Sequence, residues 1–527
     1  NKKKKIENHI SSSRNSLLLY NGEIYNYKHI NNAHLKKKLE GIYSDTKVFV
    51  NLIEEKQNKN FYEYLDGMYA FVFYNKNKNK FIIGRDPQGE KIIYFYEDKN
   101  EIIFSSEINS ITYYLENFEI NYGVLSSYFL TRHFSLIDKT TFKNIQILKP
   151  GYEIELNLKN LNIKLKERIS LSELIDENEH DRLNRISTKD LVKYLDYLLN
   201  KNIKEMIPEK RLFGSILSGG IDSSLVSKYV SKNSLPLDYI FVNHQGKDLH
   251  TVHMDEFSKN MGKKIRIINV NKEKYYQFYK KCLNINCSPI NSHSWVGQMI
   301  ISNYTKKIKG KALFGGEGAD ELFGGYETYR QKIKNISINN SNYSKFLNYK
   351  FLKKNSYLPY FKKYFKKKWK DANKIYYFLP KQERYRAAMM YMDLTIQMSS
   401  NGLRGADLMG MANSVEMRSV FFRKEILKFG LNLPLKYKIS LNDKDDFKTK
   451  ILLKKVYLKY FPKKLLLEKQ GFAGFPNEIK TFLPNKDFSL KNVINKNFFK
   501  TKNVYDRSLD WKIVNSKYFV HKFGKNK

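Results

Sequence analysis

Residues 215–224 combine serine, glycine and aspartate in a pattern that could bind the phosphates of a nucleotide. They read Ser-Ile-Leu-Ser-Gly-Gly-Ile-Asp-Ser-Ser, with an apolar run before the glycines and a helical pattern after them. Glycine lets the backbone approach a phosphate closely, and hydroxyls and free amides at a helix start donate hydrogen bonds to it. Asp222 would repel phosphate unless it holds a Mg²⁺ ion that bridges to it. The segment therefore predicts a site for ATP and Mg²⁺, although Gly-Gly beside serine is also a common turn.

A second glycine-rich segment, residues 314–326, carries three carboxylates. It reads Phe-Gly-Gly-Glu-Gly-Ala-Asp-Glu-Leu-Phe-Gly-Gly-Tyr and includes Glu317, Asp320 and Glu321. Carboxylates beside a flexible backbone suit Mg²⁺ binding or proton transfer. Taken alone, the segment fits a capped helix start as well.

The elements that must position these segments alternate between short apolar runs and helical patterns. Alternation of this kind predicts an α/β domain with a doubly wound parallel sheet. Beyond residue 325 the chain is rich in Lys, Tyr and Phe, and we predict a helical C-terminal part. The expected strands are 212–217, 239–242, 265–270 and 312–314, and the expected helices include 221–230 and 254–261.

Residues 1–165 have a different pattern, in which short apolar runs are separated by turn-prone segments. This pattern predicts hairpins in a layered antiparallel sheet. Residues 166–190 are charged and lack apolar periodicity, so we predict a linker there and a second domain over 191–527. The apolar runs are 16–20, 69–74, 80–85, 92–96 and 102–105.

The chain has 94 Lys and Arg residues against 53 Asp and Glu, a net charge of +41. A charge of this sign suggests a polyanion partner when it is gathered in one patch. Here the basic residues are spread along the whole chain, so we interpret the charge as a compositional bias and expect no nucleic-acid partner. Cys282 and Cys287 form neither a disulfide framework nor a zinc pattern, and no apolar run approaches the ~18 residues of a membrane span. We therefore expect a cytoplasmic protein without a membrane partner.

Taken in order, residues 218–224 and 316–326 resemble the PP-loop and the acidic motif of the synthetase domain of asparagine synthetases. The resemblance implies that Asp222 and Asp320 bind Mg²⁺ and that Glu317 is the acid or base near the attacking ammonia. The family usually has Ser-Gly where this chain has two glycines. The implied ATP site consists of Leu217, Ser218, Gly219, Gly220, Asp222, Ser223, Val242, Gly315 and Gly316.

Two further segments are similar to the same family. Residues 407–418 are similar to a helix-and-loop segment that carries Glu-x-Arg, and residues 468–472 to a Lys-x-x-Phe segment. The resemblance makes Lys469 the cation that stabilises the adenylate and the transition state of ammonia attack. A positive charge fits there, because pentavalent phosphorus and tetrahedral carbon both gather negative charge. The chain contains many lysines, so Lys469 without its sequence context would be weak evidence for this role.

Residues 20–27 read Tyr-Asn-Gly-Glu-Ile-Tyr-Asn-Tyr. An amide and a backbone N–H could form an oxyanion hole there, although Asn-Gly is also the commonest hairpin turn. With 44–46, 65–71, 84–91 and 104–107, the set resembles a class II glutaminase domain. The resemblance implies an oxyanion hole formed by Asn21 and Gly22, and a glutamine α-amino group held by Glu23 and Asp45.

Glutaminase domains of this class begin with a cysteine whose thiol attacks glutamine. This sequence has no cysteine before Cys282, does not start with Met, and lacks the early arginine segment of the family. We expect that the chain as written does not hydrolyse glutamine. A sequence that lacks the first part of a longer protein is the favoured explanation, and a natural loss of the nucleophile is the alternative.

The resemblance implies conversion of aspartate to asparagine through an acyl-adenylate, with release of AMP and pyrophosphate. The expected partners are small molecules, namely ATP, aspartate or another carboxylate, and glutamine or ammonia; a homodimer is left open. The family often has Asp-Arg and then Arg-x-Pro-Phe-Leu-Asp, whereas this chain has Asp407-Leu408 and, over 418–423, Arg-Ser-Val-Phe-Phe-Arg. A related enzyme that amidates another carboxylate, such as a sugar acid, therefore stays open.

Two alternatives come from other classes. A tRNA-modifying PP-loop enzyme would explain the charge, but it predicts a nucleic-acid-binding appendage instead of a glutaminase-like first domain. A non-catalytic remnant is the other, and retained ATP–pyrophosphate exchange would reject it.

Overall fold

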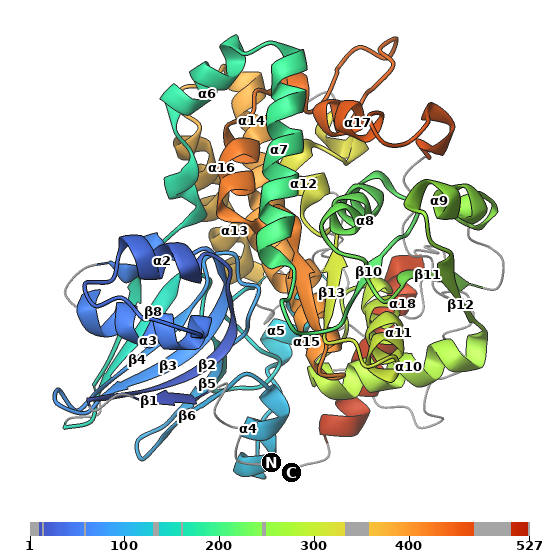
Figure 1. Cartoon of the computed structure of the whole chain (residues 1–527). Coiled ribbons are helices and arrows are strands. Elements are labelled where there is room, and N and C mark those ends of the chain that lie inside the picture. Colours follow the sequence, from blue (N-terminus) through green and yellow to red (C-terminus); the bar gives the residue numbers. More distant parts are fainter. Residues whose placement is uncertain are drawn as a thin grey trace. The chain divides into compact units, whose positions relative to one another are not determined.

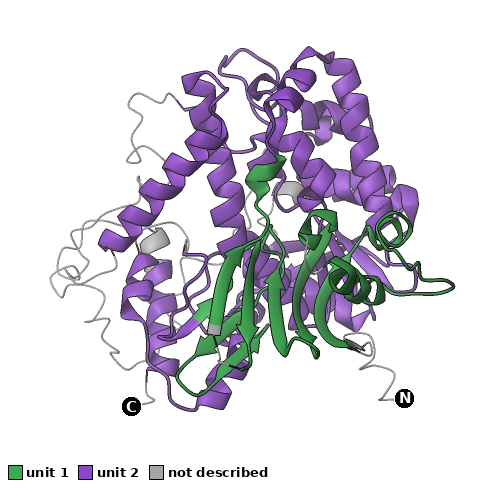
Figure 2. Cartoon of the chain, turned by 90° about the vertical axis from the view of Figure 1, so that its left-hand side faces the viewer, with its two compact units in different colours: residues 1–107, 146–174 green, residues 108–145, 175–527 purple. Residues whose placement is uncertain are grey.

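The computed structural model describes residues 10–12, 15–56, 60–129, 136–159, 162–244, 249–331, 358–467 and 507–524. The chain divides into two compact units, which Figure 2 shows in different colours. Unit 1 comprises residues 1–107 and 146–174, and unit 2 comprises 108–145 and 175–527. The domain boundaries at 165 and 190 stay predictions. None of the described helices is both long and apolar enough to cross a membrane.

Unit 1 contains a six-stranded antiparallel sheet in the order β1-β2-β3-β4-β8-β9 and a three-stranded sheet in the order β6-β5-β7. This arrangement confirms the predicted antiparallel-sheet domain, and β2 to β6 lie on the predicted apolar runs. The strands are β1 (Ile10–Ser12), β2 (Ser16–Ile24), β3 (Gly67–Asn75), β4 (Lys80–Arg85), β5 (Tyr94–Glu97), β6 (Ile102–Ser105), β7 (Ile145–Ile147), β8 (Tyr152–Asn157) and β9 (Asn162–Glu167).

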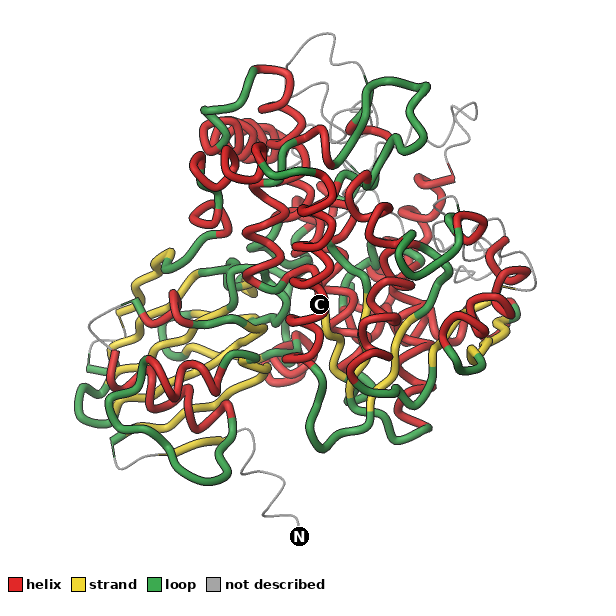
Figure 3. Tube along the Cα trace, turned by 45° about the horizontal axis from the view of Figure 1, so that its top comes forward, coloured by secondary structure: helices red, strands yellow, loops and turns green. Residues whose placement is uncertain are grey.

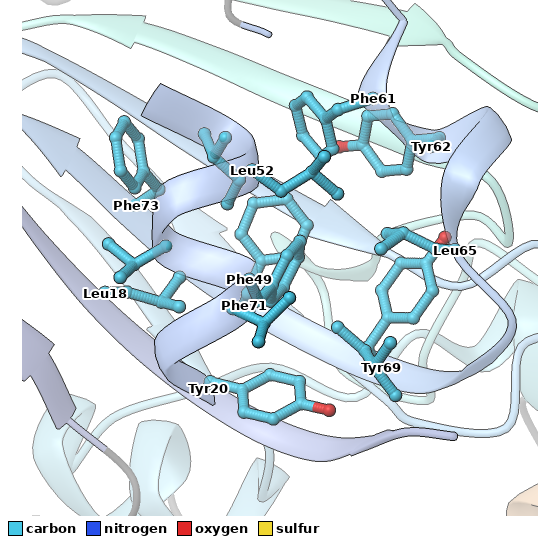
Figure 4. Packing of buried hydrophobic residues seen from close by; sticks show 14 of the residues in the cluster. Leu18, Tyr20, Phe49, Leu52, Phe61, Tyr62, Leu65, Tyr69, Phe71 and Phe73 are labelled. Carbon is cyan, nitrogen blue, oxygen red and sulfur yellow. The ribbon is translucent and has the colours of Figure 1, made fainter. Parts of the chain in front are cut away.

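The main core of unit 1 lies between this larger sheet and the helices α2 (Tyr27–Ala33) and α3 (Asp45–Lys56) (Figures 1 and 4). Val48, Phe49 and Leu52 recur at helical spacing on α3 and are fully buried. The ring of Phe49 meets Tyr20 of β2 and Phe71 of β3 edge-on, at centroid distances of 5.5 and 5.0 Å. This packing fixes α3, and with it Asp45, against β2.

Phe49→Ala should therefore destabilise unit 1 by about 3–5 kcal/mol, since it opens a cavity among fully packed aromatic rings. Amide hydrogen exchange of β2 and β3 is the suitable measurement, because it reports on this unit alone. Leu19→Ala on β2 is the matched control, as its side chain is 44% exposed and should change stability little. Equal protection in the two variants would contradict the assigned core.

Unit 2 contains a five-stranded parallel sheet in the order β12-β11-β10-β13-β14. The predicted doubly wound sheet is confirmed, and four of its strands lie on the predicted runs. The fifth, which pairs with β13, was predicted only as part of a helix-and-loop segment. The strands are β10 (Phe213–Ile216), β11 (Tyr239–His244), β12 (Ile265–Val270), β13 (Ala312–Gly315) and β14 (Glu416–Ser419).

Helices pack around this sheet and form the C-terminal part, as predicted (Figures 1 and 3). Several helix starts are capped by local hydrogen bonds: the side chain of Ser187 caps α7, and that of Asn271 caps α10. The helices of unit 2 are α4 (Ile108–Leu115), α5 (Tyr122–Ser127), α6 (Glu177–Arg185), α7 (Thr188–Met206), α8 (Ile221–Asn233), α9 (Met254–Met261), α10 (Lys272–Asn286), α11 (Ser294–Lys307), α12 (Ala319–Phe323), α13 (Leu358–Ile375), α14 (Lys381–Met392), a π-helix (Asp393–Gly402), α15 (Leu403–Met411), α16 (Lys424–Asn432), α17 (Ile451–Tyr457) and α18 (Arg507–Phe523).

The order of the strands reverses at β10. The chain leaves β10 through α8 to reach β11 on one side, whereas β13 lies on the other side of β10. Right-handed crossovers in opposite directions place their helices on opposite faces of the sheet. The carboxyl ends of β10 and β13 therefore lie at the switch point, which is where open α/β sheets bind ligands.

Candidate active site

The loop between β10 and α8 is shaped by its own serine hydroxyls. Ser223 Oγ accepts a hydrogen bond from the Ser218 amide at 3.0 Å and lies 2.8 Å from Ser218 Oγ. Gly219 has φ +78°, a left-handed conformation that favours glycine. Gly220 is the residue before α8, so the helix begins at the end of this loop. The predicted cradle is thus a tight turn that presents the start of a helix.

The loop after β13 packs directly against this turn. A Cβ at Gly316 would lie 2.8 Å from Asp222 Cβ and 3.0 Å from the Ser223 amide nitrogen, so only glycine fits. At Gly318, φ is +89° and a Cβ would meet the Phe422 ring at 2.4 Å. The two glycine-rich segments predicted to act together therefore lie in contact, at the carboxyl ends of neighbouring strands.

Lys450 connects the two carboxylates that were predicted to bind metal. Its ammonium nitrogen lies 2.7 and 2.5 Å from the two carboxylate oxygens of Asp222 and 2.7 Å from Asp320 Oδ1. Burial alone would lower the pKa of Lys450, but the carboxylates of Asp222 and Asp320 raise it above its usual value. Lys450 directly precedes α17, and its backbone amide donates to the Gly324 carbonyl. Asp222 and Asp320 therefore face one point.

This pair of carboxylates fits a Mg²⁺ ion. Both carboxylates direct hard oxygen atoms to one point. In this structure the positively charged ammonium group of Lys450 occupies that point. Within the described ranges, no group of three or more His, Cys, Asp or Glu side chains could enclose a metal. Two carboxylates suit Mg²⁺, which commonly takes one or two from protein and completes its shell with phosphate and water.

Glu317 lies in the same loop, next to Asp222. Burial raises the pKa of its carboxyl, and the charge of Asp222 raises it further, while hydrogen bonds to its own amide and to the Gln298 side chain lower it. Gly315 makes room for it, because a Cβ there would lie 2.0 Å from Glu317 Oε2. A carboxyl with a raised pKa is suited to accept and release a proton near neutral pH.

Leu217 and Val242 were predicted to line an adenine pocket. Both are buried, at the carboxyl ends of β10 and β11. The Leu217 amide donates to the Ile240 carbonyl at 3.0 Å, which extends the pairing of the two strands up to the phosphate loop. The adenine pocket lined by Leu217 and Val242 stays a prediction.

A family model for asparagine synthase matches residues 180–515, more than half of the chain, and includes both loops. The chain belongs to the asparagine synthase family. A second model, for a glutamine amidotransferase domain, matches residues 8–166.

Three curated relatives show how far the similarity to asparagine synthetases extends. Asparagine synthetase [glutamine-hydrolyzing] 2 of Bacillus subtilis is 28% identical, over 61% of this chain and 44% of its own length. Asparagine synthetase [glutamine-hydrolyzing] 1 of the same organism is 26% identical over 89% of this chain and 77% of its own length. Putative asparagine synthetase [glutamine-hydrolyzing] 1 of Methanocaldococcus jannaschii is 26% identical over 80% of this chain and 65% of its own length. The match thus spans under half of the first relative and about three quarters of the second.

The Glu-x-Arg segment of this family member packs against α7. Arg418 Nε donates to Glu416 at 2.9 Å, and its Nη1 donates to the Met206 carbonyl. Arg423, where the family often has Asp, is buried and donates to Glu205 at 2.6 Å. These arginines therefore bind structural partners on α7. The predicted Lys469 lies outside the described residues.

In unit 1, the residues predicted to bind glutamine gather at the end of β2. Gly22 has φ +152°, and a Cβ there would lie 2.0 Å from the Met68 carbonyl oxygen. Asp45, at the start of α3, accepts hydrogen bonds from the Tyr20 hydroxyl at 3.0 Å and the Ile24 amide at 3.2 Å. Asp45 is thereby brought beside the strand that carries Asn21, Gly22 and Glu23.

Sequence reasoning missed Lys450 and Gln298. Lys450 lies 228 positions from Asp222 and is one of many lysines, so only its three-dimensional contacts distinguish it. Gln298 lies in the middle of α11 with no motif around it. No local signal in the sequence could have identified either residue.

Proposed function

We propose that this chain makes asparagine from aspartate, ATP, and glutamine or ammonia. The observation that supports this best is the convergence of Asp222 and Asp320 on one cation beside Glu317, at the switch point of a PP-loop sheet. The relatives named above are asparagine synthetases, which favours aspartate as the acceptor.

The reaction needs two steps because a carboxylate is a poor electrophile. In the first step, the side-chain carboxylate of the substrate aspartate attacks the α-phosphorus of ATP. Pyrophosphate then leaves from the cradle formed by residues 218–223. Asp222 and Asp320 would hold Mg²⁺, which supplies positive charge to the phosphates when bound. In the second step, ammonia attacks the acyl carbon, AMP leaves, and Glu317 accepts the proton lost by the nitrogen. Lys469 would stabilise the negative charge of both transition states.

The structure also bears on which carboxylate is amidated. Of the departures from the family, Arg423 is buried and donates to Glu205 on α7. The changes at Leu408 and over 418–423 keep a related enzyme that amidates another carboxylate, such as a sugar acid, as the alternative. We also propose that Asn21 and Gly22 form an oxyanion hole, and that Glu23 and Asp45 hold the glutamine amino group.

The test is to supply the protein with ATP, Mg²⁺, aspartate and an ammonium salt, and to measure AMP and asparagine. Equal amounts of both products are expected, and AMP should not form when aspartate is left out. AMP formation that depends on tRNA, or on a different carboxylate, would contradict the proposal. We also propose a cytoplasmic location, which the two buried, free cysteines support.

The pH dependence tests the role of Glu317. Its pKa is raised, mainly by burial, and a general base must be deprotonated to act. The amide-forming step should therefore slow about tenfold for each pH unit below this pKa. With the concentration of free NH₃ held constant at each pH, Glu317→Gln should slow it by about 10²-fold and abolish the acidic limb of the pH profile. A limb that persists in the variant would assign the proton transfer to another group.

A further inference from the structure

Two acceptor oxygens beside the proposed adenylation centre have no donor in the described part of the chain. Glu317 Oε2 and Gln298 Oε1 are both buried, and neither has a hydrogen-bond partner among the residues that the structure describes. Buried polar atoms nearly always have a partner, so each such atom calls for an explanation. A ligand that donates hydrogen bonds is one explanation.

The two oxygens belong to neighbouring side chains. The Gln298 side chain hydrogen-bonds to the Glu317 carboxyl and lowers its pKa. The amide NH₂ must face the carboxylate, because two acceptors repel, and this orientation leaves Gln298 Oε1 as the free acceptor. Gln298 comes from α11 and Glu317 from the loop after β13, two elements that pack together.

The chemistry of a ligand that would satisfy this pair follows from the two oxygens. Such a ligand donates at least two hydrogen bonds and fits next to Asp222, whose charge also acts on Glu317. Ammonia has three N–H donors and a single lone pair. With two N–H groups bound to the oxygens, that lone pair stays free to attack. Water can also donate to both oxygens, but only ammonia is a nucleophile that forms an amide.

We propose that Gln298, together with Glu317, binds the ammonia that attacks the acyl-adenylate. This inference rests on the proposed function and adds the residue that selects and orients the nucleophile. Gln298 Oε1 accepts one N–H bond and Glu317 Oε2 another. After attack, Glu317 takes the proton that the nitrogen loses, and the C–O bond to AMP breaks as the amide forms.

The test compares the two half-reactions in Gln298→Met, which keeps the length of the side chain and removes its oxygen. Aspartate-dependent ATP–pyrophosphate exchange needs no ammonia and should stay within about twofold of the unmodified chain. The KM for ammonia should rise about tenfold, the effect of one neutral hydrogen bond. Gln382→Met is the matched control, because Gln382 is an exposed glutamine on α14. It should change neither quantity.

The outcomes separate this inference from the proposed function. Normal exchange with an unchanged KM for ammonia in Gln298→Met would overturn the ammonia site and leave the proposed function intact. Absence of exchange in the unmodified chain would contradict the proposed function, and this inference with it. If Gln298→Met does not fold, Gln298→Asn retracts the oxygen by one methylene and should also raise the KM. An unchanged KM in that folded variant would overturn the inference too.

Discussion

Asp222→Ala should reduce aspartate-dependent AMP formation by about 10³-fold or more. Asp222 lies at the start of α8, in contact with the loop that carries Glu317, and its carboxylate faces the same point as Asp320. A metal ion that neutralises phosphate charge is worth several kcal/mol in the transition state, and each 1.36 kcal/mol corresponds to a tenfold change in rate. Loss of one of two protein carboxylates should remove most of this stabilisation. The measurement is ATP–pyrophosphate exchange, titrated with Mg²⁺.

Asp190→Ala is the matched control for this variant. Asp190 is an exposed residue of α7, paired with Lys193, and its side chain is 59% exposed. Its removal should leave exchange unchanged. Asp222→Asn adds a second comparison, because it keeps the size of the side chain and removes only the charge. If Asp222→Asn retains full exchange at every Mg²⁺ concentration, Asp222 is not a metal ligand.

The sequence predicted much of the fold because the apolar runs of unit 2 are short and bounded. The runs at 239–242 and 265–270 became β11 and β12, and the helical pattern at 254–261 became α9 with unchanged bounds. β11 lies inside the sheet with Tyr239–Val242 buried, so its apolar pattern is continuous. β12 is an edge strand that buries Ile265, Ile268 and Val270, so only part of its pattern is apolar. β14 was not predicted as a strand, because Glu416–Ser419 contains two charged residues that find partners only after folding.

The loops of the site were predictable for a related reason. Glycines at 316 and 318 are needed where one backbone approaches another, and that need appears directly in the sequence. Lys450 and Gln298 were not predictable, since each acts through a contact between segments that are far apart along the chain. The chain contains so many lysines that composition gives no sign that Lys450 faces two carboxylates.

Lys450→Met should destabilise unit 2 by about 3–5 kcal/mol, because it leaves two partly buried carboxylates facing each other without a cation. Unfolding followed by tryptophan fluorescence measures this directly, since Trp295, Trp369 and Trp511 all belong to unit 2. Lys459→Met is the matched control. Lys459 pairs with Asp196 but is 38% exposed, so its loss should cost less than about 1 kcal/mol.

Mg²⁺ should restore more stability to Lys450→Met than it adds to the unmodified chain. In the unmodified chain, the ammonium occupies the point that Asp222 and Asp320 share, so the ion has to displace it or bind beside it. In the variant, both carboxylates are available, and an ion that binds only the folded state stabilises it by mass action. An equal effect of Mg²⁺ on both proteins would mean that the ion and Lys450 do not compete. In that case Lys450 would belong to the permanent structure of the phosphate site, and the metal would need other ligands.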